Sequence, residues 1–198
     1  VRTGMFASAL RASLLVIKDK IISHEDDLQG VVFYGTKDKR NTTDFENIVV
    51  ECDADSPDAA RILSLEKLLQ QTASGGDAAI ANAPYGVMSD VDASGSPITS
   101  ASRLSDALWV TSALFTAANA RGAKVSSRRV WLFTNLTDND LATRTPQRAR
   151  DQALQKAKDL ADLAIQINLF MMIPPDADDS SSSNRRANVV TEDGWWTR

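Results

Sequence analysis

Apolar residues recur at helical spacing in four parts of the chain, and short continuous apolar runs lie between those parts. The spacing of Phe6, Leu10, Leu14, Ile17 and Ile21 predicts an amphipathic helix that ends near His24. Apolar residues at helical spacing predict three further helices, over 57–70, 103–120 and 146–163. Pro57 and Pro146 are expected in the first turns of the 57–70 and 146–163 helices. The apolar runs predict strands over 30–36, 48–52, 128–135 and 165–173.

This order of helices and strands predicts the fold class. Strands that are almost continuously apolar are typical of a parallel sheet covered on both faces. We therefore predict an α/β, doubly wound, mostly parallel sheet with helices on both faces. No apolar strand precedes the first predicted helix, because only Val1–Met5 come before Phe6. Either the sheet lacks its expected first strand, or the chain as given starts part-way through a domain; we favour the second interpretation, since the first helix would otherwise have no strand to cross over from.

Burial can be predicted from the same pattern. Trp109 and Trp131 each lie inside an apolar run, and Met171-Met172 lie at the end of another, so all four are expected in the core. The inner face of the 146–163 helix is expected to consist of Ala153, Leu154, Ala157, Leu160, Ala161 and Ala164. Residues 72–101 are rich in Gly, Ala, Ser and Asp without a sustained period, which predicts a long surface loop.

Composition narrows the class of protein. A chain of 198 residues suits one α/β domain, which we place at 1–175, followed by a low-complexity linker and tail at 176–198. The net charge of −4 argues against a strong nucleic-acid clamp in this part alone. With Cys52 as the single cysteine and His24 as the single histidine, neither an intrachain disulfide nor a multi-histidine metal site can form. No apolar run approaches the ~20 residues of a membrane span, so we expect no membrane partner.

One short motif suggests a metal site. Asp92, Ser94 and Ser96 spell Asp-x-Ser-x-Ser, the signature of metal-dependent von Willebrand A-type domains. An octahedral Mg²⁺ site needs ligands held at the end of a rigid strand, yet the preceding residues "PYGVMSDV" interrupt any strand. We therefore predict no metal and no cofactor, and keep a metal-dependent ligand-binding A-type domain as the alternative function.

Several longer blocks resemble one family. The stretches "ISHEDDLQGVVFYGTKDKRNTTDFENIVV", "DADSPDAARILSLEKLL", "LSDALWVTSALF" and "RRVWLFTNLTDND" resemble, in this order, the amino-terminal von Willebrand A-like α/β domain of the seventy-kilodalton subunit of the Ku heterodimer. The resemblance covers roughly residues 5–173. It departs from the family in the absent first strand, the expanded 72–101 loop and the tail after Asp176.

The resemblance implies a function. Ku binds DNA double-strand-break ends in non-homologous end joining and at telomeres, which places the chain in the nucleus, on chromosomes and telomeres. The implied partners are the eighty-kilodalton Ku subunit, DNA ends (mainly through domains outside this chain) and end-joining and telomere proteins. The amino-terminal domain would lie at the periphery of the heterodimer as a protein-docking platform. The family is often described as an ATP-dependent DNA helicase subunit, but no Gly-x-x-x-x-Gly-Lys-[Ser/Thr] motif occurs here, and we predict no catalysis by this domain.

Two groups of side chains are candidate sites. A protein-docking face is predicted on the outward side of the 146–163 helix, formed by Arg148, Asp151, Gln152, Gln155, Asp159 and Asp162. A solvated surface helix would carry the same pattern. The basic loop residues Lys37, Lys39 and Arg40 are candidate DNA contacts, although Asp38 between them also fits a solubilising turn. Asp138 and Asp140 follow a strand end where α/β sheets bind ligands, but no nucleophile or phosphate-binding glycine loop accompanies them.

Overall fold

The structure is a computed structural model that describes residues 3–23, 26–82, 85–86, 100–123, 125–136 and 140–172. In chain order its helices and strands are α1 (Thr3–Ser23), β1 (Gln29–Tyr34), β2 (Ile48–Asp55), α2 (Ala59–Asn82), α3 (Leu104–Ala120), β3 (Arg128–Thr134), α4 (Gln147–Asp162) and β4 (Ile165–Met171). A 3₁₀ turn over Ser100–Arg103 leads into α3, and a π-helical turn over Asp140–Arg144 precedes α4. The predicted strand 30–36 and helix 103–120 are confirmed to within two residues at each end.

The described strands form two pairs. β1 and β2 run antiparallel, and β3 and β4 run parallel in register from Arg128 opposite Ile165 to Thr134 opposite Met171. The connection from β3 to β4 contains α4, as a parallel crossover requires, whereas the 35–47 connection contains no helix and suits antiparallel neighbours. The sheet that was predicted to be mostly parallel therefore includes one antiparallel pair, β1 with β2.

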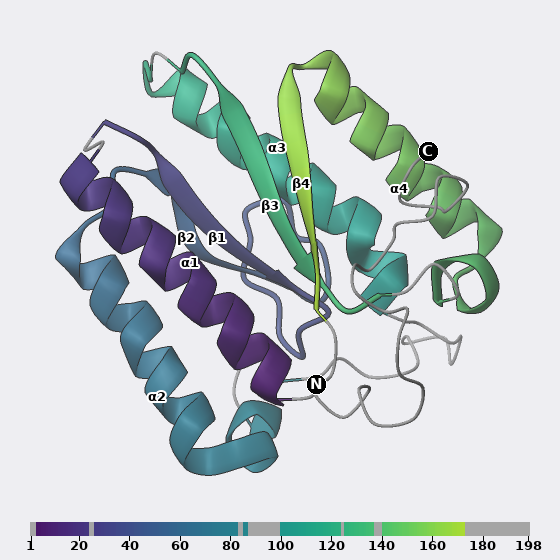
Figure 1. The fold of residues 1–198 in the computed structure, drawn as a ribbon. Helices are drawn as coiled ribbons and strands as arrows, with labels where there is room; N and C mark the ends of the chain where they lie inside the picture. The colour runs from purple at the N-terminus through teal and green to yellow at the C-terminus, as the bar shows by residue number, and fades with distance from the viewer. Residues whose placement is uncertain are drawn as a thin grey trace, which may run out of the picture.

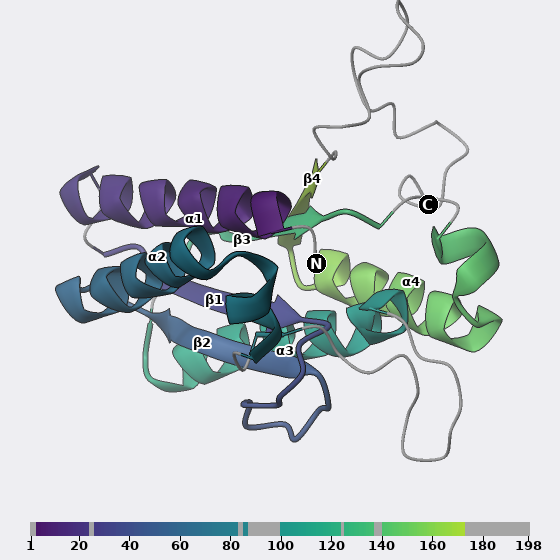
Figure 2. The same ribbon diagram turned by 90° about the horizontal axis from the view of Figure 1, so that it is seen from below.

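Helices lie on both sides of the strands, which confirms the α/β class. Figure 1 shows α1 and α2 lying side by side in front of β1 and β2, with α3 and α4 behind. Figure 2, turned by 90°, separates the layers, with α1 and α2 on one side of the strands and α3 and α4 on the other. α1 and α2 pack through Leu10, Leu14, Ile17, Leu65 and Leu68, and this cluster extends onto β1.

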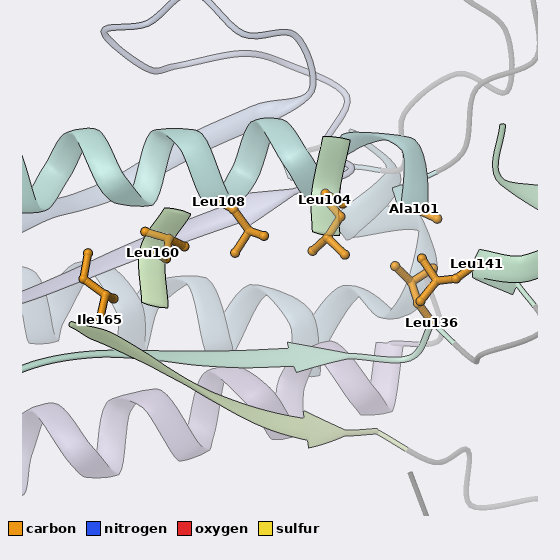
Figure 3. Packing of buried hydrophobic residues seen from close by; sticks show 8 residues of the cluster. Ala101, Leu104, Leu108, Leu136, Leu141, Leu160 and Ile165 are labelled. Atoms are coloured by element: carbon orange, nitrogen blue, oxygen red, sulfur yellow. The ribbon is translucent and has the colours of Figure 1, made fainter. Parts of the chain in front are cut away.

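The main core lies between α3, α4 and the inner face of β3 and β4. Its members are Ala101, Leu104, Leu108, Leu136, Leu141, Ala153, Leu160 and Ile165 (Figure 3). Leu104, Leu141 and Leu160 are at most 1% exposed. At roughly 2–3 kcal/mol for each fully buried leucine, burial of this cluster is a large share of the folding free energy. The core therefore fixes α4 against the sheet and leaves its opposite side outward.

The two strand pairs meet through a tyrosine. The Tyr34 hydroxyl, at the end of β1, donates to Thr134 Oγ1, at the end of β3, over 2.7 Å. Thr134 is buried, and its Oγ1 also accepts from the backbone N–H of Leu136 at 3.2 Å. The low-dielectric surroundings disfavour a phenolate and raise the pKa of Tyr34 to about 12. One side-chain hydrogen bond thus joins residues that lie far apart in sequence.

Burial differs from prediction at several aromatic and small residues. Trp109 is 50% exposed and Trp131 is 40% exposed, so neither is a core residue. Ala161 and Ala164 are exposed rather than inner-face residues, because α4 ends at Asp162 and Ala164 takes a left-handed φ of 55°. Met171 and Met172 are only partly buried.

The segment predicted as a long loop over 72–101 begins as helix. α2 continues to Asn82 through Gly75 and Gly76, so the loop expectation was wrong for 72–82. Residues 87–99 lie outside the described part of the chain, as does the predicted tail over 176–198.

Candidate protein-docking site

The outer side of α4 carries the predicted docking residues on one surface. The helix begins at Gln147, so Pro146 is the N-cap residue rather than a first-turn residue as predicted, and Ala153 and Leu160 are buried on the inner side. Spacings of three, four and seven residues place the six predicted residues within roughly 100° of the helix circumference. This set, called the acidic α4 face below, comprises Arg148, Asp151, Gln152, Gln155, Asp159 and Asp162. Five of them are exposed, and Asp159 is partly buried.

The charges of the acidic α4 face are only partly neutralised within the described part of the chain. Its three aspartates exceed its one arginine by two negative charges. The hydrogen bonds within the helix, from Gln147 Nε2 to Asp151 and from Gln155 Nε2 to Asp159, are both 2.9 Å long and involve neutral donors. Lys156 Nζ lies 3.8 Å from Asp159 and pairs with that one aspartate of the face, and the Lys156 side chain itself is only 13% exposed. The face can therefore present a negative potential to a basic partner surface.

An exposed tryptophan borders this face, and sequence reasoning missed it. The Lys156 ammonium lies 4.0 Å from the centre of the Trp109 ring on α3. The Phe45 ring meets the same indole edge-on, with centroids 6.5 Å apart. Leu104, Ala107 and Leu108 turn inward from α3, and the helical rotation from Leu108 to the next residue carries Trp109 outward. Half-exposed tryptophan beside charge is typical of protein interfaces.

The basic loop is less available to DNA than its sequence suggests. Lys39 Nζ lies 2.7 Å from Glu46 and 2.9 Å from Asp44, and hydrogen bonds to these two carboxylates raise the pKa of Lys39. Arg40 pairs with Glu51. Lys37 is exposed. Two of the three cations are thus already paired with carboxylates, which weakens the argument for phosphate binding, and DNA contact at this loop stays a prediction.

Glu51 lies at the centre of a polar cluster that no local sequence motif predicted. Its side chain on β2 is 8% exposed and is bound by Arg40, by Ser64 Oγ at 2.7 Å and by the Tyr85 hydroxyl at 2.6 Å. Burial and the Glu51 hydrogen bond together raise the pKa of Tyr85 to about 12. The cluster joins the 35–47 loop, β2, α2 and Tyr85. Because every partner donates to one carboxylate, Glu51 connects these separate parts of the chain.

The sequence motifs for metal and ligand binding cannot be placed. Asp92, Ser94, Ser96 and Asp138 lie outside the described residues. The Asp140 carboxylate accepts from Arg144 at 3.1 Å. In the ranges that are described, no three His, Cys, Asp or Glu side chains come together in a way that could hold a metal ion. Within the same ranges, no helix combines the length and apolar character needed to span a bilayer.

Comparison with known proteins assigns the family. The model of the Ku70/Ku80 N-terminal alpha/beta domain matches residues 3–185. The chain belongs to this family, and the α/β fold with helices on both faces is that of its N-terminal domain.

Two of the similar proteins carry Ku70 in their names. The chain is 35% identical over 177 residues to "ATP-dependent DNA helicase ku70" of Dictyostelium discoideum, covering 84% of this chain and 17% of that protein. It is 33% identical over 170 residues to mouse "X-ray repair cross-complementing protein 6", covering 86% and 24%. The plant "ATP-dependent DNA helicase 2 subunit KU70" of Arabidopsis thaliana is 28% identical over 166 residues, covering 81% and 24%. The chain spans about a quarter or less of the length of these relatives.

Proposed function

We propose that this domain is part of a Ku-type subunit that binds DNA double-strand-break ends in the nucleus. The subunit pairs with an eighty-kilodalton Ku subunit and acts in non-homologous end joining and in telomere maintenance. The family match supports this proposal, as do the relatives whose names refer to DNA helicase subunits and X-ray repair. The domain itself acts as a peripheral platform on which other proteins dock.

The acidic α4 face is the observation that carries the docking role. It combines two excess negative charges with an exposed Trp109 at its border, on a helix held rigidly by buried Leu160. Negative charge repels DNA phosphates, so this surface suits a protein partner that presents Lys or Arg. Rigid support matters because a helix that is already ordered loses little conformational entropy when a partner binds.

Charge reversal on this face tests the docking role. In the full-length subunit assembled with its partner, Asp159→Lys/Asp162→Lys should reduce recruitment of end-joining proteins to DNA ends by about tenfold or more, because like charges then face a basic partner. Affinity for the DNA end should stay within about twofold, because the face is not a DNA contact. The helix should tolerate both changes, since a lysine near a helix C-terminus interacts favourably with the helix dipole.

A matched variant controls for nonspecific charge effects. Asp26→Lys/Asp53→Lys reverses two exposed aspartates that lie away from α4, and it should leave recruitment unchanged. Circular dichroism should show that both variants fold. Recruitment that is normal in the α4 variant, or that is reduced equally in both variants, would exclude a specific docking role for the acidic α4 face.

A further inference from the structure

The outer face of β3 and β4 is left uncovered by the described helices. Side chains alternate along a strand, so Val130, Leu132 and Ile167 pack inward while their neighbours point the opposite way. In Figure 1, α1 and α2 lie in front of β1 and β2, and no described helix lies in front of β3 and β4. This outer set, called the open sheet face below, consists of Arg129, Trp131, Phe133, Gln166, Asn168 and Phe170.

Three aromatic rings cluster on the open sheet face. Phe133 and Phe170 are directly opposite in the register and stack at 4.8 Å between centroids. Trp131 contacts Phe170 at 5.6 Å. Trp131 is 40% exposed and Phe170 is 38% exposed, so the cluster leaves a large apolar area in contact with solvent. Contiguous exposed apolar area of this kind marks a binding surface.

The open sheet face carries a positive charge at one end only. Arg129 is exposed two residues before Trp131, on the same side of β3, so a guanidinium lies at one end of the face and the aromatic cluster lies toward the other. Exposed Gln166 lies opposite Arg129 and Asn168 lies opposite Trp131, so no carboxylate on the face neutralises Arg129. A fitting ligand carries aromatic groups with one or two acidic groups a few residues away.

The chain itself contains such a ligand. "TEDGWWT", residues 191–197, places Glu192-Asp193 two to four residues before Trp195-Trp196. The spacing resembles that between Arg129 and the aromatic cluster, which is also two to four residues along β3. We propose that the open sheet face binds this C-terminal segment, with Trp195-Trp196 against Trp131 and Phe170 and the two acidic residues near Arg129.

The connection to β4 makes this binding favourable. β4 ends at Met171, beside the aromatic end of the open sheet face. Residues 173–190 comprise 18 residues, and random-coil scaling gives a polar linker of that length an average reach of roughly 20–25 Å, whereas the face extends over about 13 Å. The segment is therefore held at an effective concentration in the millimolar range, and even weak contacts suffice to dock it.

A reporter cysteine on the open sheet face can test the proposal in the full chain. Asn168→Cys replaces an exposed polar residue, and the natural Cys52 is buried, with its pKa raised by that burial, so it should react slowly with a thiol reagent. We expect Cys modification at position 168 to be about tenfold faster when Trp195→Ala/Trp196→Ala is added, which corresponds to a docking equilibrium constant of about ten. The same reporter introduced as Gln155→Cys on α4 should react at one rate in both backgrounds.

A charge exchange makes the test specific. Arg129→Glu should remove the protection at position 168, and adding Glu192→Arg/Asp193→Arg should restore it. Equal reactivity with and without the two tryptophans overturns the proposal. Protection that rises with protein concentration would assign the face to a second copy of the chain, and protection that requires added oligothymidine would assign it to single-stranded nucleic acid; either result also overturns the proposal.

Discussion

Removing the Tyr34 hydroxyl, which joins the two strand pairs, should lower the free energy of unfolding by a measurable amount. Tyr34→Phe deletes the 2.7 Å hydrogen bond to Thr134 and leaves the ring in place. A hydrogen bond of this kind contributes about 1 kcal/mol to the free energy of unfolding. Thr134→Val should cost more, about 2–4 kcal/mol, because the Leu136 N–H and the Tyr34 hydroxyl then both lack their acceptor.

The losses in free energy of unfolding caused by Tyr34→Phe and Thr134→Val should be strongly non-additive. In the Thr134→Val background the Tyr34 hydroxyl has no acceptor, so Tyr34→Phe should cost nothing or should stabilise the protein slightly. Urea unfolding of the two single variants and the double variant measures this coupling. Additive losses would refute the view that the pair acts as one connection between the strand pairs.

Because the pKa of Tyr34 is raised in the folded chain, we expect the protein to lose stability at alkaline pH. The pKa of Tyr34 is raised from 10.0 to about 12 in the folded chain. Below pH 10 the phenol is neutral in both states, and its contribution to stability is fully present. Between pH 10 and about 12 the unfolded chain releases the proton while the folded chain retains it, so each pH unit lowers the free energy of unfolding by up to about 1.4 kcal/mol.

Phenolate absorbance gives a direct assay for this shift. The chain has two tyrosines, so Tyr85→Phe leaves Tyr34 as the sole phenol. Its titration midpoint should lie about two pH units higher in the folded variant than in guanidinium. From about pH 8 to about pH 11, Tyr85→Phe should lose roughly 1 kcal/mol more stability than Tyr34→Phe/Tyr85→Phe. A midpoint near the ordinary value in the folded chain would show that the hydroxyl is not desolvated.

Four further substitutions test other parts of the structure. Leu160→Ala, at a position with 0% exposure, should lower the free energy of unfolding by about 2–5 kcal/mol in urea, and a loss below about 1 kcal/mol would contradict the described core. Ala164→Gly should raise the thermal midpoint by relieving a left-handed φ, at a gain of up to about 1 kcal/mol, whereas helical Ala161→Gly should lower it. Glu51→Ala should cost about 2–3 kcal/mol and speed proteolysis of the 35–47 loop, because three donors lose their shared acceptor; unchanged proteolysis would separate the loop from Glu51.

Hydrophobic periodicity was sufficient to predict the helices and strands whose burial is decided locally. α4 was predicted over 146–163 and lies over Gln147–Asp162, with five of its six predicted outer residues exposed, because its polar and apolar sides differ clearly. α2 was predicted too short, because Gly75 and Gly76 have low helix propensity and yet lie within the helix. The length of α2 was therefore not decided by the helix propensity of its residues.

Tertiary coverage could not be predicted from local pattern. Trp109 and Trp131 each have apolar neighbours in sequence, which predicts burial, but exposure depends on which other elements cover that side. The Glu51 cluster joins Arg40, Ser64 and Tyr85 from separate parts of the chain, and no spacing rule connects such positions. For the same reason, the position of Lys156 over the Trp109 ring became visible only in three dimensions.

Site-specific photocrosslinking tests the docking role of α4 most directly. A photoreactive residue at Gln155, on the acidic α4 face, should capture proteins when the full-length heterodimer is bound to DNA ends, and Asp159→Lys/Asp162→Lys should abolish those adducts. The same residue placed at exposed Lys67 on α2 should not capture them. Adducts between position 155 and DNA, or identical protein adducts from both positions, would contradict the account.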